Sequence, residues 1–174
     1  GLITYTANSP ESFVKKVPFW RYMDYARVAA YYMLDASSPV PTVGALTNDW
    51  RNCNASPFVG RNWPSEISNW QAWHGRQVIF AEIGYASREY TAREPWLGGG
   101  TYSATAQSNC LEAMFQIWQN MGRYPWFKGA FLWMWGASDT GGAGNTGATP
   151  QGKPGYTVVK KWLSSVSNVA VTVT

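Results

Sequence analysis

The feature that most constrains the fold is the alternation of short β-prone segments with helix-type patterns along the chain. The β-prone segments are residues 2–8, 23–34, 77–85 and 129–136. Helix start signals or helical spacing follow them, from Ser9, Val43, Pro64, Ser103 and Gly155. This alternation predicts an α/β fold with a parallel sheet of four βα units and right-handed crossovers. Four units are half of a (β/α)8 barrel, which typically needs about 250 residues.

The most informative strand is the one that ends in a carboxylate. The run Val78 to Ala81 is apolar, as expected for a buried parallel strand, and is followed by Glu82 and Gly84. Side chains alternate along a strand, so Val78, Phe80 and Glu82 are predicted to share one face. Glu82 then lies at the carboxyl end of the strand, where (β/α) barrels place their chemistry, and Gly84 relaxes the backbone behind it. A glutamate that merely leaves the strand into solvent is the alternative.

Two helices are defined by their boundaries. After the N-cap residue Ser103, a stripe of apolar residues is predicted to face the core and to stop at Gly122; it comprises Ala106, Cys110, Ala113, Met114, Ile117 and Met121. In residues 64–73, Ile67, Trp70 and Trp73 recur at three-residue spacing, and Gly75 ends the helix. His74 is therefore interpreted as a helix-end residue and not as a catalytic base.

Composition narrows the function. Among 174 residues there are 11 Trp and 10 Tyr, while only 14% are charged, against about a quarter in typical domains. Surplus Trp and Tyr often line a groove that stacks on flat apolar faces such as sugar rings. The net charge is +4 and the basic residues are scattered along the chain, which argues against nucleic-acid binding. The sequence contains no apolar run of 18 residues, so no membrane-spanning helix is predicted.

The sequence contains no recognisable motif for binding a metal or a cofactor. It has one histidine and two cysteines without metal-ligand spacing, so we expect neither a metal nor a cofactor. Cys110 is expected to be packed on its helix, and whether it pairs with Cys53 stays open. No signal peptide is recognised at Gly1.

Five segments in order resemble the second half of a clan A retaining glycoside hydrolase barrel, nearest to the family 113 β-mannanases. They are residues 2–8, Phe19-Trp20 with Asp24 and the strand end Ala30-Tyr31-Tyr32, residues 78–85, residues 129–135, and Gly152-Lys153-Pro154. The resemblance covers residues 2 to about 166. It implies that the four strands are the fifth to the eighth of a TIM barrel, and it sets residues 167–174 apart as a β-prone tail or linker.

The resemblance also implies roles for individual residues. Glu82 would be the catalytic nucleophile, and Tyr31 would hydrogen-bond that carboxylate and orient it. Trp133 would be the platform under the sugar at the cleaved bond, with Trp135 supporting it. Asn8 and Trp96 complete the expected substrate contacts, the latter from a long loop after the Glu82 strand. Tyr31 as an ordinary strand-end tyrosine, and Trp133 and Trp135 as core residues, are the alternatives.

One departure from the family pattern matters. Retaining hydrolysis needs a second carboxyl group about 5–5.5 Å from the nucleophile. In this clan the acid/base glutamate follows an asparagine, and the sequence contains no Asn-Glu pair. The carboxylates expected in loops on the proper face match no family position; they are Glu11, Asp35, Glu89, Glu94 and Asp139.

Half a barrel would leave apolar residues uncovered. An inner face with this many apolar side chains cannot stay exposed; those expected on it are Tyr5, Tyr31, Phe80, Phe131 and Trp133. We therefore expect another chain or a second copy to complete the barrel.

Two functions are compatible with these sequence features. One is a retaining endo-β-mannanase or related glycanase acting on β-linked polysaccharide at the cell surface or outside the cell. The other is a non-catalytic carbohydrate-binding or structural half-barrel within a larger assembly.

Overall fold

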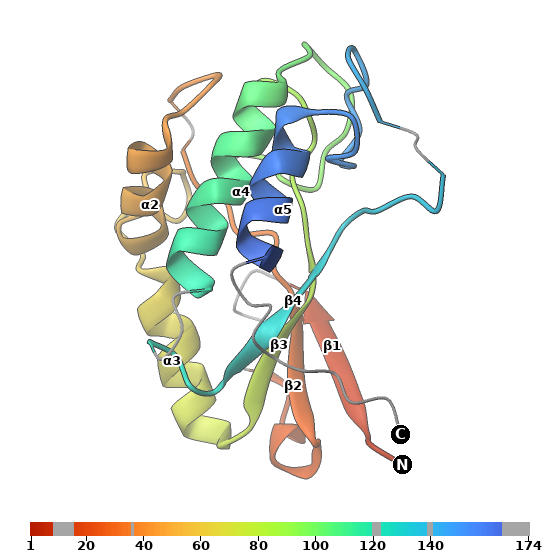
Figure 1. Ribbon diagram of the computed structural model, residues 1–174. Coiled ribbons are helices and arrows are strands. Elements are labelled where there is room, and N and C mark those ends of the chain that lie inside the picture. Colours follow the sequence, from red (N-terminus) through yellow and green to blue (C-terminus); the bar gives the residue numbers. More distant parts are fainter. Residues whose placement is uncertain (9–15, 36, 120–122, 139–140, 165–174) are drawn as a thin grey trace.

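A parallel four-stranded sheet forms the base of the structure. The computed structural model describes residues 1–8, 16–35, 37–119, 123–138 and 141–164. Its strands are β1 (Thr4–Asn8), β2 (Tyr25–Ala29), β3 (Gln77–Ile83) and β4 (Phe127–Leu132). All neighbours pair in parallel, in the order β1-β2-β3-β4 (Figure 1). The predicted parallel sheet in chain order is confirmed.

Helices connect the strands and lie to one side of the sheet. They are α2 (Val43–Arg51), α3 (Trp63–His74), α4 (Ala104–Trp118) and α5 (Pro154–Ser164), preceded by the 3-10 helix η1 (Trp20–Tyr22). Figure 1 shows α2 and α3 stacked along one flank, with α4 and α5 side by side. No helix of the described ranges is long and apolar enough to cross a membrane. The predicted helix start at Ser9, the stop at Gly122 and the tail 167–174 lie outside the described residues.

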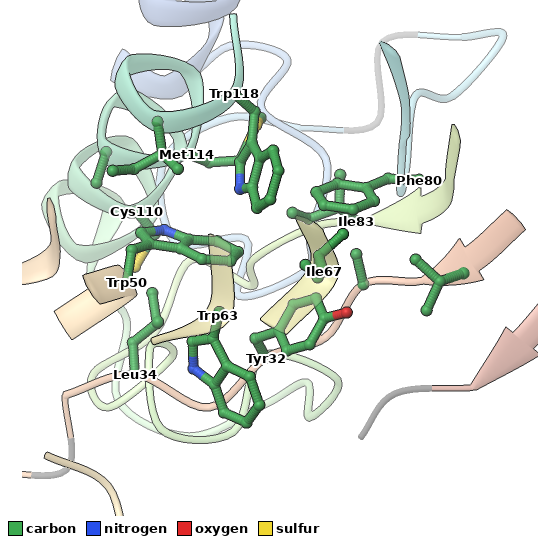
Figure 2. Packing of buried hydrophobic residues seen from close by; sticks show 14 of the residues in the cluster. Tyr32, Leu34, Trp50, Trp63, Ile67, Phe80, Ile83, Cys110, Met114 and Trp118 are labelled. Carbon is green, nitrogen blue, oxygen red and sulfur yellow. The ribbon is translucent and has the colours of Figure 1, made fainter. Parts of the chain in front are cut away.

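The helix-facing side of the sheet carries the core. Val28, Val78 and Phe80 are completely buried and belong to one cluster with the indoles of α2, α3 and α4 (Figure 2). The ring of Phe80 lies 4.8 Å from that of Trp118, centre to centre. The expectation that Phe80 faces the open inner side is therefore wrong, because its large apolar ring is taken up by the helix layer.

A second correction concerns the alternation along β3. The pairing of β3 with β4 is irregular between Phe80 and Ile83, and both of these side chains are fully buried. Glu82, between them, is only half-buried. A local irregularity thus brings Ile83 into the core three positions after Phe80 and removes Glu82 from the face of Val78 and Phe80.

The opposite side of the sheet is less covered. Phe131 of β4 is 62% exposed, and the guanidinium of Arg27 on β2 lies 5.7 Å above its ring centre. This cation–π contact gives the charged Arg27 a partner on the sheet.

Tyr5 of β1, by contrast, pairs with the buried Ala26 and lies two residues before the buried Ala7, so it shares their helix-facing side. It is 44% exposed there, with its ring against those of Phe19 and Trp20. The expectation that Tyr5 faces the open inner side is therefore also wrong.

Local sequence accounts for the helix that precedes β3. The Asn62 side chain caps the N-terminus of α3, and Gly75 ends it in the left-handed conformation with φ 71°. Trp70 is buried, but Trp73 is 63% exposed, so the predicted three-residue stripe breaks there. His74, four residues after Trp70, is buried instead. Its ring packs edge to face against that of Trp70, with the ring centres 4.4 Å apart. Its predicted place at the helix end is confirmed.

The longest helix follows its predicted pattern. Ser103 caps α4 by accepting a hydrogen bond from the Ala106 amide at 3.2 Å. The stripe from Ala106 to Ile117 is buried as expected, and Met121 lies outside the described residues. Cys110 and Cys53 are both buried free thiols.

Candidate active site

Glu82 and Tyr31 meet at the carboxyl ends of two adjacent strands. The register of β2 with β3 pairs Ala29 with Glu82, and the Ala30 amide donates to the Glu82 carbonyl at 2.6 Å. Tyr31 follows directly, and its hydroxyl donates a hydrogen bond to Oε1 of Glu82. Burial, together with this hydrogen bond and the negative charge of Glu82, raises the pKa of Tyr31 far above its ordinary value. Tyr31 therefore stays a protonated donor at any physiological pH.

The backbones of β3 and β4 come unusually close behind this pair. A Cβ on Gly84 would overlap the carbonyl oxygen of Trp133 and stand 2.8 Å from its carbonyl carbon. The Trp133 amide donates to the Ile83 carbonyl at 2.8 Å, which continues the ladder past the end of β4. Gly84 is thus required by the approach of a neighbouring strand rather than by an unusual backbone angle. This approach places Trp133, 52% exposed, next to the strand end that carries Glu82.

The other predicted substrate contacts occupy different places. Asn8 is the last residue of β1 and pairs with Ala29, so it lies at the same carboxyl edge as Glu82. Trp135 is 49% exposed, and its ring lies 5.8 Å from that of Tyr156 on α5. It lines a groove between β4 and the helices α4 and α5, so its observed packing is against α5. The described ring contacts do not include one between Trp135 and Trp133.

A pocket of about 380 Å³ opens beside Tyr31. Its walls include Tyr31, Phe58 and Trp63, and Trp96 from the long loop after β3. The structure thus brings Trp96, one of the predicted substrate contacts, to a cavity that shares a wall with the Glu82–Tyr31 pair.

A buried lysine joins the loops at the same edge. Lys153, only 5% exposed, donates from Nζ to Ser87 Oγ at 2.8 Å, to Asn145 Oδ1 at 3.0 Å and to the Gly147 carbonyl at 3.0 Å. Burial lowers the pKa of this amine. Its three protons have three acceptors, so the charge is satisfied without a carboxylate. Lys153 belongs to the Gly152-Lys153-Pro154 segment of the family resemblance, but the sequence carries no signal for its role as a clip between two loops.

Two of the loop carboxylates named above are held by neighbouring residues. Asp35 is 4% exposed and accepts hydrogen bonds from the Ser37 amide and hydroxyl, both at 2.6 Å. These hydrogen bonds lower its pKa, against the effect of burial. Glu94 forms an ion pair with Arg88 at 3.0 Å. Both carboxylates are engaged in their own loops, and Glu11 and Asp139 lie outside the described residues.

No metal-binding group emerges from the described part of the chain. It contains no cluster of three or more His, Cys, Asp or Glu side chains that could hold an ion. Burial and the nearby Arg76 lower the pKa of His74 to about 4, and its Nδ1 accepts the Arg76 amide at 2.9 Å. This histidine is a neutral packing residue at the far end of β3 from Glu82.

Parallel βα units in chain order, with polar and aromatic side chains gathered at the strand ends, correspond to about half of a TIM barrel. The chain belongs to glycoside hydrolase family 113, because residues 1–161 match the sequence profile of that family. No curated protein matches the sequence.

Solved structures agree with this assignment. A family 113 β-mannanase from Alicyclobacillus acidocaldarius, in complex with ManMIm, is 25% identical and superposes with a TM-score of 0.72. The match covers 96% of this chain and 46% of that one. Two structures of a family 113 β-1,4-mannanase, one of them a complex, are each 21% identical and share the fold with TM-scores of 0.67 and 0.66. The chain therefore spans about half the length of the solved enzymes it matches.

Proposed function

We propose that this chain is the nucleophile-bearing half of a retaining endo-β-mannanase site, with β1 to β4 as the fifth to eighth barrel strands. The observation that carries the proposal is the hydrogen bond from Tyr31 to Glu82 at the carboxyl ends of β2 and β3. A nucleophilic carboxylate must be ionised and correctly aimed, and a hydroxyl that cannot ionise at working pH favours both. In this proposal residues 1–166 are the half-barrel and residues 167–174 a linker.

The chemistry assigns one step to this chain. Glu82 attacks the anomeric carbon of the bound sugar as the bond to the leaving oxygen breaks, which gives a covalent glycosyl-enzyme. Trp133, exposed beside the strand end, offers the flat face under that sugar, and Asn8, Trp96 and Trp135 are the further proposed contacts. A second carboxyl group must protonate the leaving group and later activate water. We assign that group to the missing half of the barrel.

Completion of the barrel is the second part of the proposal. Among the described residues, the order of the sheet leaves β1 and β4 with one unpaired edge each. Beside β4 an apolar groove of about 360 Å³ runs against α4 and α5. An open parallel edge next to an apolar groove favours pairing with further strands and helices. A second half-barrel chain or a second copy would supply them, and light scattering distinguishes these from a stable monomer.

A non-catalytic role is the alternative, and a specific observation favours it. Asp35 and Glu94, two of the loop carboxylates, are committed to partners of their own. With the aromatic residues kept and the acid absent, the half-barrel would bind β-linked glycan within a larger assembly. A location outside the cell or at its surface suits either function.

Covalent trapping tests the catalytic proposal. A 2-deoxy-2-fluoro mannoside with a fluoride leaving group needs little acid assistance, so this chain should form the adduct without its partner. Mass spectrometry of digests should locate one added sugar on the peptide that contains Glu82. Glu82→Gln should take up none. Labelling absent even after addition of the other barrel half would refute the nucleophile assignment and leave the binding function.

A further inference from the structure

The inner face of the sheet, the side away from the helices, carries an arginine without an opposite charge. Ala26 and Val28, on either side of Arg27, are fully buried on the helix side, so the Arg27 side chain points to the inner face. Its guanidinium lies 5.7 Å from the ring centre of Phe131. Within the described ranges it forms no hydrogen bond and no ion pair. The N–H donors of Arg27 therefore lack acceptors in this part of the chain.

The strands themselves offer Arg27 little negative charge. Glu82 is the only Asp or Glu within the bounds of β1 to β4, and its carboxylate accepts the Tyr31 hydroxyl. Asp24, just before β2, accepts the Ile3 amide at 2.6 Å. Each of these carboxylates already has a hydrogen-bond partner of its own. A carboxylate for Arg27 is therefore expected from the polypeptide that covers this face.

Barrel geometry indicates where that carboxylate must stand. The interior of an eight-stranded barrel is filled by layers of typically about four side chains, which come from alternate strands. Within a half-barrel, β2 and β4 belong to the same alternate set, in agreement with the contact between Arg27 and Phe131. The other places in this layer belong to the missing half. Once that half is in place, Arg27 is removed from water, where an unpaired charge is costly.

A second copy of the chain would fit this layer in shape but not in charge. A copy related by a two-fold rotation would fill the open places with its own Arg27 and Phe131. It would bring two guanidiniums into one layer of a water-excluded core, and β1 to β4 of that copy carry no carboxylate other than Glu82. Like charges repel strongly in such surroundings. The charge on the inner face therefore disfavours completion of the barrel by a second copy.

We infer that the partner which completes the barrel is a polypeptide of different sequence that presents an Asp or Glu to Arg27 from its own inner face. The inference rests on the proposed function and decides between the two completions named there. A carboxylate accepts two N–H groups of a guanidinium side by side. Such a pair would fix the register of the two halves as well as neutralise the charge.

The Arg27→Glu variant of the full chain serves as the probe for the partner's carboxylate. In a mixture with the wild type, it presents a glutamate across the barrel from Arg27. Sedimentation equilibrium compares the wild type, the variant and their equimolar mixture, and native mass spectrometry separates the mixed dimer from the two self-paired dimers by mass. The mixed dimer should form at least about tenfold more tightly than either self-paired dimer.

Two further variants make the result specific to the inner face. Lys160→Glu makes the same change of charge on the exposed side of α5, and its mixture with the wild type should associate no more tightly than the wild type alone. Arg27→Met removes the charge without adding another. Should Arg27→Glu fail to fold, Arg27→Met takes its place and should self-associate about tenfold more tightly than the wild type, because the repulsion is gone.

Failure of this inference is distinguishable from failure of the catalytic proposal. A wild-type dimer as tight as the mixed dimer would overturn the inference in favour of a second copy. A mixture no tighter than its components, or an equal gain with Lys160→Glu, would also overturn it. Covalent trapping of Glu82 in the wild type is a separate measurement, so normal trapping beside any of these results would leave the nucleophile in place. A tight mixed dimer without trapping would support the partner's carboxylate and reject Glu82 as nucleophile.

Discussion

Gly84→Ala probes the contact that holds Trp133 against the strand carrying Glu82. The new Cβ would overlap the Trp133 carbonyl oxygen and stand 2.8 Å from the carbonyl carbon and 3.3 Å from Cβ of that residue. The first two atoms belong to the backbone, so rotation of a side chain cannot relieve the overlap. Overpacking typically costs about 1–3 kcal/mol, and we expect the upper end of that range here. The hydrogen bond from Trp133 to Ile83 would be strained as the strand ends separate.

Urea denaturation measures this loss, with Gly98→Ala as control. A Cβ on Gly98 meets nothing within 4 Å, and this glycine is exposed, so its substitution should change the unfolding free energy by less than about 0.5 kcal/mol. Trapping of Glu82 in folded Gly84→Ala should be slower as well, because the platform has moved. Equal stability of the two alanine variants would refute the close approach of β3 and β4 at this point.

Three further substitutions test other parts of the structure. Asp49 is 3% exposed, and its Oδ2 has no hydrogen-bond partner in the part of the chain that the structure describes. Burial and the nearby Asp35 raise its pKa from 3.8 to about 6. The folded state therefore holds this proton more tightly, so stability should fall as pH rises from about 4 to about 6, and Asp49→Asn should raise the unfolding free energy at about pH 8 by about 1–3 kcal/mol. A denaturation series that shows no gain would contradict this. Lys153→Met removes three hydrogen bonds of about 1.5–3 kcal/mol each but also relieves the burial of a charge, so a net loss of about 2–3 kcal/mol is expected in thermal unfolding. An unchanged midpoint of thermal unfolding in Lys153→Met would contradict a stabilising role for the hydrogen bonds of Lys153. Trp133→Ala should weaken mannohexaose binding by about 1–3 kcal/mol in calorimetry, and equal affinity would count against the platform.

Much of the fold follows from local rules in the sequence. Ser103 and Gly75 were predictable as helix boundaries, because caps depend on residues within one turn. The position of Glu82 at a strand end follows from the apolar run before it. Its pairing with Tyr31 was reached only through the family resemblance, since the two residues are 51 positions apart and depend on strand register.

The parts that escaped prediction depend on distant contacts or local irregularity. The burial of Phe80 and Ile83 on one side needs a break in alternation that no residue type signals. His74 is buried in place of Trp73 because its side of α3 faces Trp20, whose ring centre lies 6.1 Å from that of His74. The clip formed by Lys153 joins loops 66 positions apart, and composition alone marks a lysine as exposed.

The most direct test of the central claim is a rapid-mixing measurement with a dinitrophenyl β-mannoside. We expect this chain alone to release one dinitrophenolate per molecule in a burst and then to stall, because Glu82 can attack but no base activates water. Mannan should remain uncut until the other half of the barrel is added, and Glu82→Gln should give no burst. A burst of equal size in Glu82→Gln, or no release of dinitrophenolate even by the completed barrel, would contradict the account.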